Sequence, residues 1–492
     1  MAAKNLTKLT ILHSNDMHGD FLAENVDEKL VGGVSYLSGY INKVRAEENN
    51  VLYCVAGDMF RGSVIDSEFK GLSTVEIMNM LAPDIVTLGN HETDYGVTHL
   101  LFIEKMAKFP IINANLHIST NGARLFKPYE IIEIGGMKIL FIGILTEDVI
   151  AQTKNMDGMI GSLVNVEDAA AEVGKICNAH NAIDIDFTVL LTHIGYEKDI
   201  ELARLLDPAW GVDVIIGGHS HTLPEKAIEE NGVVIVQAGT GTDQIGRFDI
   251  MIDTDRNAVD SYEWRTVPVN AENCPYDEEI EKLINGFKDK TDAKYNRVIT
   301  RFSEKLTHPT RYRETQIGDL YADLMMESLG TDAFLLGSGS IRTTELGPIV
   351  TLQTLTENFP YDDPVYMLRV SGKHFKAMIK YMLRDEALLP GAHTEFYQLS
   401  KGIEVVYNQK DHSFEKFNFM GVPLEDDKVF SIGMQKYHFM NFTDVFNVDI
   451  NEVEKEFGKA RVISTSCFQV IQEYLEENQL LYQEVEGRLV IK

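Results

Sequence analysis

The sequence is poor in cysteine, and the cysteines it has are far apart. Cys54, Cys177, Cys274 and Cys467 form no CxxC pair within 492 residues, a pattern that argues against a disulfide framework or a cysteine-based zinc site. No run of 18 apolar residues occurs, so we expect no membrane-spanning helix and no membrane partner. Residues 1–8 lack the apolar segment of a signal peptide, which predicts a cytoplasmic protein.

Basic residues are scarce as well. The chain has 45 Lys and Arg against 75 Asp and Glu, a formal net charge of −30. A field of this sign repels polyanions, so a nucleic acid polymer is not an expected partner. A small nucleotide can still bind, because nearby arginines and metal ions outweigh distant surface charge.

The length exceeds what one hydrophobic core usually supports, which favours two domains. From Leu9 to about Pro268, short apolar strands alternate with amphipathic stretches, a pattern typical of an α/β layered domain. Ile131–Ile134 and Lys138–Ile144 flank Gly135-Gly136 and predict a hairpin, so the sheet should be mixed. We place this domain at residues 1–270.

A charged amphipathic helix is predicted over Tyr276–Arg297, within a connecting segment at residues 271–299. Residues 300–492 then mix strands and helices without strict alternation, which indicates a smaller α+β domain. Its predicted elements are strands Phe334–Leu336, Ile403–Tyr407 and Val429–Met434 and a helix over Ile463–Asn478.

Five apolar runs each end just before residues that can bind a metal ion. Asp16 and His18 follow Leu9–Leu12, Asp58 follows Val51–Ala56, Asn90 and His91 follow Ile85–Leu88, His193 follows Phe187–Leu191, and His219 and His221 follow Val214–Ile216. Sites in open α/β sheets form beyond the carboxyl ends of the strands, so these residues should converge. Each alone is weak evidence, because Gly-Asp is usually a turn and a strand-end histidine is usually structural.

Nitrogen and oxygen donors without cysteine suit a pair of divalent ions, with Mn, Zn or Co expected and Mg possible. Asp58 is the best candidate to bridge them, because a carboxylate can offer one oxygen to each ion. Two ions about 3.5–4 Å apart are the usual machinery for hydrolysing phosphate esters.

The ordered motifs resemble the calcineurin-like metallophosphoesterase superfamily. Ile11-Leu-His-Ser-Asn-Asp-Met-His-Gly19 and Gly89-Asn-His-Glu-Thr-Asp94 are similar, more narrowly, to the 5′-nucleotidase family. The resemblance implies a four-layer α/β sandwich followed by a substrate-binding domain. It also implies that a metal-activated hydroxide releases phosphate from a nucleotide. Asp16, His18 and His221 would complete one metal's ligands with Asp58, and Asn90, His193 and His219 the other's.

His91 and Asp94 look catalytic rather than metal-binding. His91 follows a ligand directly, and Asp94 can accept its second N–H and fix the charged imidazole. By residue type alone, Asp94 could equally be a helix N-cap. The 5′-nucleotidase pattern favours a His–Asp pair, although here only Thr93 separates Glu92 from Asp94, one residue fewer than in that pattern.

The resemblance places substrate recognition in the second domain. Gly337-Ser-Gly339-Ser-Ile-Arg342 is similar to a Gly-rich segment whose arginine binds phosphate, and Arg311 to a second such arginine. Phe396 or Tyr397 would be the first of two rings that sandwich the nucleobase, and Phe446 the second. Gly337 stands where that family usually has Asn, and without the resemblance these rings could equally be core residues.

Several alternatives share these features. A 2′,3′-cyclic-nucleotide phosphodiesterase with 3′-nucleotidase activity, or a nucleotide-sugar hydrolase, would use the same metal motifs. A non-catalytic nucleotide-binding protein is disfavoured, because such a protein needs no His91–Asp94 pair. A structural surface protein is disfavoured by the lack of repeats. The metal, the base preference and the oligomeric state are left open by the sequence.

Overall fold

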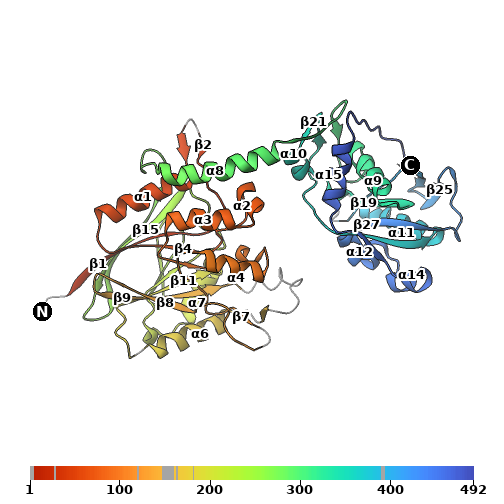
Figure 1. The fold of residues 1–492 in the computed structure, drawn as a ribbon. Helices are drawn as coiled ribbons and strands as arrows, with labels where there is room; N and C mark the ends of the chain where they lie inside the picture. Colours follow the sequence, from red (N-terminus) through yellow and green to blue (C-terminus); the bar gives the residue numbers. More distant parts are fainter. Residues whose placement is uncertain are drawn as a thin grey trace. The chain divides into compact units, whose positions relative to one another are not determined.

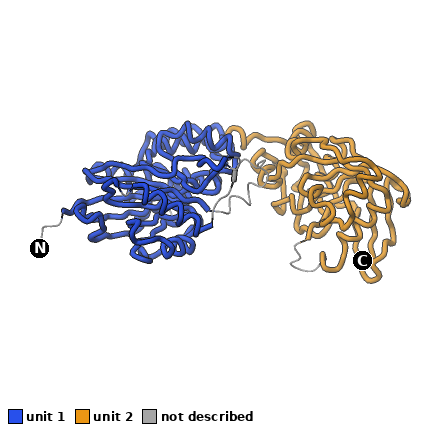
Figure 2. The backbone as a smooth tube through the Cα atoms, turned by 90° about the horizontal axis from the view of Figure 1, so that it is seen from below, with its two compact units in different colours: residues 1–291 blue, residues 292–492 orange. Residues whose placement is uncertain are grey.

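The computed structural model of the protein describes residues 5–26, 29–118, 121–146, 160–161, 165–180, 182–388 and 394–492. Contacts between Cα atoms divide the chain into two compact units, residues 1–291 and 292–492 (Figure 2). Helix α8 (Glu278–Tyr295) contains the division. Among the described residues, no helix combines the length and apolarity needed to cross a membrane.

Unit 1 is built on two sheets of six strands each (Figure 1). In spatial order, the first sheet comprises β16 (Ala258–Pro268), β15 (Gln244–Asp253), β1 (Leu6–Ser14), β4 (Val51–Ala56), β5 (Ile85–Thr87) and β6 (Ile111–Ile112). The second comprises β13 (Ile228–Glu230), β14 (Val233–Val236), β12 (Val214–Ile216), β11 (Phe187–His193), β9 (Met137–Leu145) and β8 (Tyr129–Ile134). Strands β1, β4, β5 and β6 run parallel, as do β9, β11, β12 and β14, while β8 and β9 form the predicted antiparallel hairpin.

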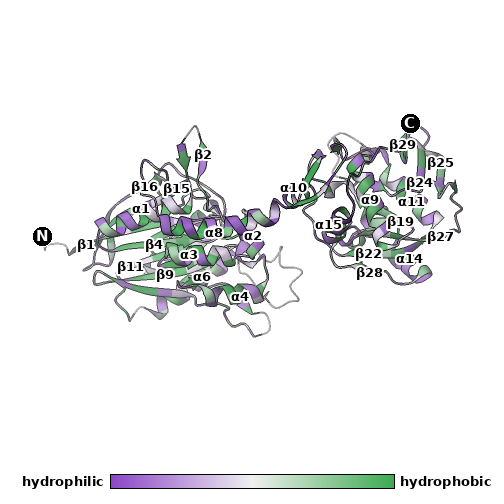
Figure 3. Cartoon of the chain, turned by 45° about the horizontal axis from the view of Figure 1, so that its top comes forward, coloured by the Kyte–Doolittle hydropathy of each residue, from purple (hydrophilic) through white to green (hydrophobic). Residues whose placement is uncertain are grey.

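The two sheets pack face to face, and helices cover their outer faces. Along β4, Leu52, Cys54 and Ala56 enter the core between the sheets, whereas Tyr53 and Val55 pack under helices. A strand buried on both faces has to be apolar throughout, which explains the unbroken runs in the sequence and the hydrophobic colour of these strands in Figure 3. The first sheet is covered by α1 (Val34–Glu47), α3 (Leu72–Leu81), α4 (Val97–Met106) and α8, and the second by α6 (Val166–Ala179) and α7 (Tyr196–Leu205). The predicted four-layer α/β sandwich is confirmed.

Unit 2 has a mixed five-stranded sheet and a four-stranded sheet. The first is ordered β23 (Tyr397–Leu399), β19 (Ala333–Gly337), β27 (Val429–Gln435), β22 (Val365–Ser371) and β28 (Arg461–Ser464), and the second β26 (Val422–Pro423), β25 (Ser413–Phe419), β24 (Ile403–Asn408) and β29 (Leu489–Ile491). One core lies under α9 (Gln316–Leu329), α10 (Leu352–Asn358) and α15 (Cys467–Glu477), and another under α11 (Gly372–Met382), α13 (Phe442–Phe446) and α14 (Ile450–Phe457). The predicted α+β character of this part is confirmed.

The structure also contains smaller elements. They are α2 (Val64–Phe69), α12 (Lys436–Met440), and the strand pairs β2 (Glu24–Val26) with β3 (Lys29–Val31), β7 (His117–Ile118) with β10 (Ile160–Gly161), β17 (Val298–Arg301) with β21 (Ile349–Thr351), and β18 (Leu306–Thr307) with β20 (Glu345–Leu346).

The predicted start of the last helix is wrong. Ile463 lies in β28, which pairs with β22, and the helix begins only at Cys467. The Ser466 hydroxyl accepts a hydrogen bond from the Gln469 N–H at 2.9 Å and caps the helix. The apolar periodicity runs across this cap, so it did not reveal the boundary.

Candidate active site

The predicted metal ligands meet at the carboxyl ends of strands from both sheets of unit 1. Asp16 and His18 follow β1, Asp58 follows β4, Asn90 and His91 follow β5, His193 ends β11, and His219 and His221 follow β12. The loops after β1 and β4 are bonded together, because the amides of Asp16 and His18 donate to the carbonyls of Gly57 and Asp58, each at 3.0 Å.

Much of this backbone is strained. Asp16, His18, Asp58, His219 and His221 all have φ between 50° and 82°, a region that side chains other than glycine rarely adopt. Such conformations persist only where the surrounding structure fixes them, and they cluster at functional sites. The motifs in the sequence carry no sign of this strain.

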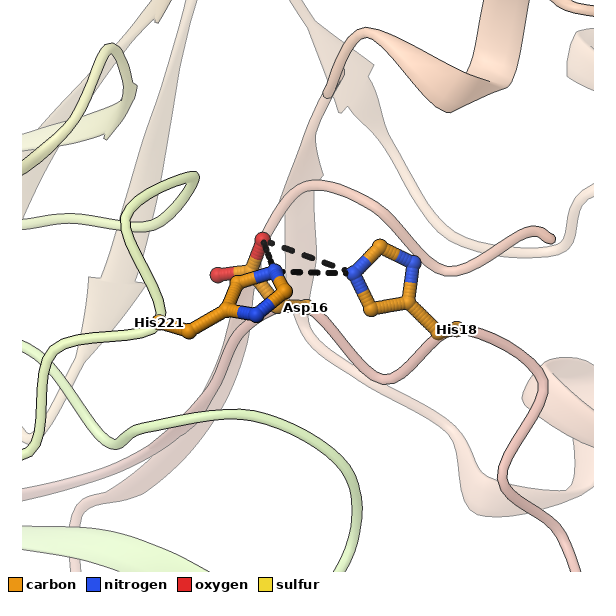
Figure 4. Close-up of side chains that lie close together, drawn as sticks. All are labelled: Asp16, His18 and His221. Carbon is orange, nitrogen blue, oxygen red and sulfur yellow. Dashed lines mark hydrogen bonds and ion pairs between the residues drawn. The ribbon is translucent and has the colours of Figure 1, made fainter. Parts of the chain in front are cut away.

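One group of ligand atoms is formed by Asp16, His18 and His221 (Figure 4). His18 Nε2 lies 3.1 Å from His221 Nε2, and Asp16 Oδ1 lies 3.4 Å from His221 Nε2 and 3.9 Å from His18 Nε2. Ligands bonded to one ion at about 2.0–2.1 Å lie about 3.0–3.4 Å apart. The group therefore has nearly the spacing that a shared cation requires.

A second group surrounds His193. Its Nε2 lies 3.1 Å from Asp58 Oδ2 and 3.2 Å from Asn90 Oδ1, and His219 Nδ1 lies 2.8 Å from the same Asn90 oxygen. These separations also match ligands of one ion. His193 Nδ1 lies 2.8 Å from the Ala56 carbonyl, which can only accept, so the Nδ1–H donates and Nε2 is the nitrogen that could bind a metal ion.

Asp58 is held in its ionised form. Burial alone would raise the pKa of this carboxyl, but His193 and the His91 amide outweigh burial and lower it to about 2. The His193 pKa is lowered by burial and raised more strongly by Asp58 and Asp16, to about 9. The carboxylates around His193 thus favour positive charge at this place, and a metal ion would supply such a charge as a proton does.

His91 and Asp94 form a close pair. His91 Nδ1 lies 2.8 Å from Asp94 Oδ2, and this bond raises the pKa of His91. His91 also belongs, with His18 and Asp58, to a third group of closely spaced donor atoms. Asp94 follows the 3₁₀ turn η1 (His91–Thr93) and caps no helix N-terminus, so the N-cap alternative does not apply.

Glu92, which the sequence left without a role, holds two of the loops together. Its buried carboxylate accepts hydrogen bonds from the amides of Met59 at 2.7 Å and Asp58 at 3.0 Å, and from that of Gly89. The loop after β4 is thereby tied to the loop after β5. The sequence signal was its place in the Gly-Asn-His-Glu motif, but its partners are visible only in the fold.

Unit 2 contains a pocket of about 260 Å³ that brings together Arg311, Gly339 and Arg342. Gly339 lies in the 3₁₀ turn η3 (Ser338–Ser340) after β19, and its N–H donates to Glu395 Oε1 at 2.8 Å. Its backbone passes so close to Arg311 that an added Cβ would lie 2.2 Å from Nη2. This pocket has the guanidinium groups expected of an anion site.

The aromatic platform expected from the sequence needs correction. The rings of Tyr397 and Phe446 are buried in one core and their centroids lie 4.8 Å apart, whereas a base between two rings needs about 7–8 Å. Phe396 is also buried, and it lines a different pocket beside Tyr312 and Arg313. The exposed rings at the arginine pocket are Tyr361 and Tyr437, which the sequence analysis missed.

Comparison with known proteins agrees with this architecture. The family of calcineurin-like phosphoesterases matches residues 9–223, and the 5′-nucleotidase C-terminal domain matches residues 297–448. A 5′-nucleotidase of Mus musculus is 26% identical, covering 99% of this chain and 91% of its own length. A snake venom 5′-nucleotidase of Naja atra is 26% identical, covering 82% of each chain.

Solved structures with this architecture span nearly the whole chain. A 5′-nucleotidase precursor from Thermus thermophilus is 25% identical, with a TM-score of 0.60 and 99% of each chain covered. A putative 5′-nucleotidase from Staphylococcus aureus shares the fold at 18% identity, with a TM-score of 0.62, covering 99% of this chain and 100% of its own.

Proposed function

The chain belongs to the 5′-nucleotidase family, and from this premise we propose that it hydrolyses nucleoside 5′-monophosphates to nucleosides and phosphate. In this reaction the P–O bond to the 5′ oxygen breaks and a water oxygen takes its place on phosphorus. The observation that carries the proposal is the convergence of two ligand groups and the His91–Asp94 pair at one rim of unit 1.

The donor set fits two divalent ions. The two groups use nitrogen and oxygen atoms at the mutual distances that bound ions impose, and Asp58 is the proposed bridge between them. Bound there, two divalent ions would stabilise charge on the phosphoryl oxygens and make a water nucleophilic at neutral pH. We propose Mn or Co as the activating metal, with Zn and Mg as further candidates.

His91 is the proposed proton-bearing group of the site. Asp94 holds Nδ1–H at 2.8 Å, so the ring is oriented and Nε2 is the atom free to donate to a phosphoryl oxygen. The positive charge favoured by Asp94 would stabilise the negative charge that develops on those oxygens. Positioned groups of this kind usually contribute about 10²–10⁴ in rate.

The pocket of unit 2 is the proposed nucleotide-binding site. Arg311 and Arg342 line it and supply guanidinium donors for phosphate oxygens, and the Gly339 backbone allows close approach. Tyr361 and Tyr437 replace the buried rings as proposed partners of the base, because their side chains are exposed at the same pocket.

A substrate panel tests the proposed activity. Chelator-treated protein should be inactive and regain activity with Mn or Co, and Asp58→Asn should lose activity by several orders of magnitude. Phosphate release is measured for nucleoside 5′-monophosphates, a 2′,3′-cyclic nucleotide and a nucleotide sugar. Faster turnover of either of the last two would replace the proposed substrate, and full activity without metal would refute the dimetal site.

A pair of variants tests the site of base binding. Tyr437→Ala should raise the KM for a nucleotide, with about 1–3 kcal/mol of stacking lost, and leave hydrolysis of a small aryl phosphate unchanged. Phe446→Ala should instead lower the thermal stability, because Phe446 is 1% exposed in the core. Equal losses on the two substrates for Tyr437→Ala would show that this ring does not bind the base.

A further inference from the structure

Arg61 has an unusual conformation beside the metal ligands. It lies three residues after Asp58 in the loop that follows β4, and its φ is 67°. The left-handed region costs a residue with a side chain about 1–2 kcal/mol. Such strain persists only where neighbours fix it, and in folded proteins it clusters at functional sites.

The backbone of Arg61 is fixed from below by a buried carboxylate. Its N–H donates to Asp66 Oδ2 at 2.9 Å, and the Tyr95 hydroxyl donates to the same oxygen at 2.9 Å. Asp66 is fully buried. The next residue, Gly62, lies so close to the loop after β1 that an added Cβ would be 2.3 Å from the His18 carbonyl oxygen. Arg61 therefore cannot shift without disturbing the His18 loop.

The guanidinium of Arg61 is oriented by the same carboxylate that orients His91. Nε donates to Asp94 Oδ2 at 2.7 Å, and His91 Nδ1 lies 2.8 Å from that oxygen. The Arg61 Cζ atom also lies 5.7 Å from the centroid of the Tyr95 ring. Two contacts thus hold a side chain that is 50% exposed.

These contacts use only one of the donors of the guanidinium. Among the described residues, none accepts a hydrogen bond from either Nη of Arg61. A guanidinium has five N–H donors and stays charged at all working pH values. Four N–H donors are therefore left on this half-exposed guanidinium. Its neighbour His91 belongs to the group of closely spaced potential metal ligands that also contains His18 and Asp58.

We propose that Arg61 binds a non-bridging phosphoryl oxygen of the substrate through its Nη donors. This inference rests on the proposed phosphomonoester hydrolysis and adds a group to it that unit 1 itself supplies. The Nε–Asp94 bond fixes the plane of the guanidinium, so the Nη atoms are presented without loss of side-chain freedom on binding. No bond is made or broken by Arg61; it stabilises the charge on the phosphoryl oxygens.

Calorimetric titration of the metal-loaded protein with inorganic phosphate tests the contact without requiring turnover. Arg61→Gln should weaken phosphate binding by about 10–100-fold, and Arg61→Lys by less, because a point charge remains. Arg204→Gln is the matched control, since Arg204 also pairs with a carboxylate, Glu230, on the exposed face of α7. Arg204→Gln should bind phosphate with the affinity of the wild type. Arg61→Gln should have the metal content and the thermal midpoint of the wild type. Unchanged phosphate affinity in Arg61→Gln would overturn the proposal.

A double-variant cycle separates direct contact from an effect through Asp94. The side-chain amide in Asp94→Asn keeps an oxygen for the Arg61 Nε–H, so Arg61→Gln should still weaken phosphate binding in that background. If the effect of Arg61→Gln vanished in that background, Arg61 would act only by positioning Asp94, and the proposed contact would be wrong. Failure of the wild type to release phosphate from any nucleotide would refute the proposed function, while the phosphate titration would still report on Arg61.

Discussion

His91 and His193 look alike in sequence, one histidine after each of two strands, but their surroundings differ. His193 is fully buried with Asp58 and Asn90 at its Nε2, while His91 is paired at Nδ1 with Asp94. His91→Asn should keep a normal metal content and lower kcat by about 10²–10⁴. His193→Asn should lose metal. Metal analysis and steady-state kinetics on both variants check this, and an empty site in His91→Asn would identify His91 as a ligand.

Glu92 accepts hydrogen bonds from backbone amides next to the proposed metal ligands. In Glu92→Gln, the side-chain NH₂ would face at least one of the amide donors of Asp58, Met59 and Gly89, where the carboxylate now accepts. Changes of this kind behind a ligand typically lower metal affinity about 10–100-fold. Competitive metal titration measures the loss, with Glu104→Gln on the exposed face of α4 as the control. Equal metal affinity in the two variants would contradict a positioning role for Glu92.

Individual residues were predictable where a strand-end position and a donor atom sufficed. Asp16, Asp58 and His193 needed only the rule that parallel strands bring their carboxyl ends together. Arg61 and Glu92 could not be found in this way, because their proposed roles depend on contacts with Asp94 and with backbone amides that neighbouring sequence does not specify.

Helix α9 carries a buried carboxyl, that of Asp319, close to the carboxyls of Glu314 and Asp323. Arg488 donates to the two oxygens of Asp323 at 2.6 and 2.8 Å, whereas its Nε lies 3.7 Å from Asp319 Oδ2, too far for a hydrogen bond. Burial, followed by the neighbouring carboxyls of Glu314 and Asp323, raises the Asp319 pKa to about 9 despite Arg488.

This raised pKa predicts a pH-dependent cost. Between about pH 4, where the unfolded carboxyl ionises, and pH 9, the folded chain binds the additional proton, so the contribution of Asp319 to stability falls as pH rises. Asp319→Asn should lack this decrease. The difference in unfolding free energy between the variant and the wild type should be more favourable to the variant at pH 8.5 than at pH 5.5, by a change on the order of a few kcal/mol. Denaturant unfolding at both pH values measures it, with exposed Asp427→Asn as control. Parallel pH profiles for wild type and Asp319→Asn would refute the expectation.

At the level of elements, the strands of unit 1 were easier to predict than the helices and rings of unit 2. A strand that is buried on both faces, such as β4, is apolar along its whole length. An unbroken apolar run therefore predicts both a strand and its position between two layers. The rings of Tyr397 and Phe446 show the opposite case. An aromatic residue has the same appearance in sequence whether it stacks on a ligand or, as here, on another ring in the core.

Over the whole molecule, each unit has its own hydrophobic cores, but all seven proposed metal ligands belong to unit 1. Two thermal transitions are therefore expected. Metal should raise the midpoint of the unit 1 transition only. At a metal concentration a thousandfold above Kd, it should add about 4 kcal/mol to the free energy of unfolding of unit 1. Differential scanning calorimetry with and without Mn checks this, and Asp58→Asn, which lacks the proposed bridge, should show little shift. A shift shared equally by both transitions would contradict it.

The proposed ligands follow strands of two different sheets, and Asp16 and His221 lie near opposite ends of the matched phosphoesterase segment. Ions bound there would cross-link the two sheets as a disulfide cross-links distant segments. The four cysteines of this chain are all free and buried, so they form no such cross-link. Resistance of unit 1 to proteases would then depend on the metal supply of the cell. A chain made under metal starvation would be degraded faster, and its abundance would fall before any loss of activity per molecule could be measured.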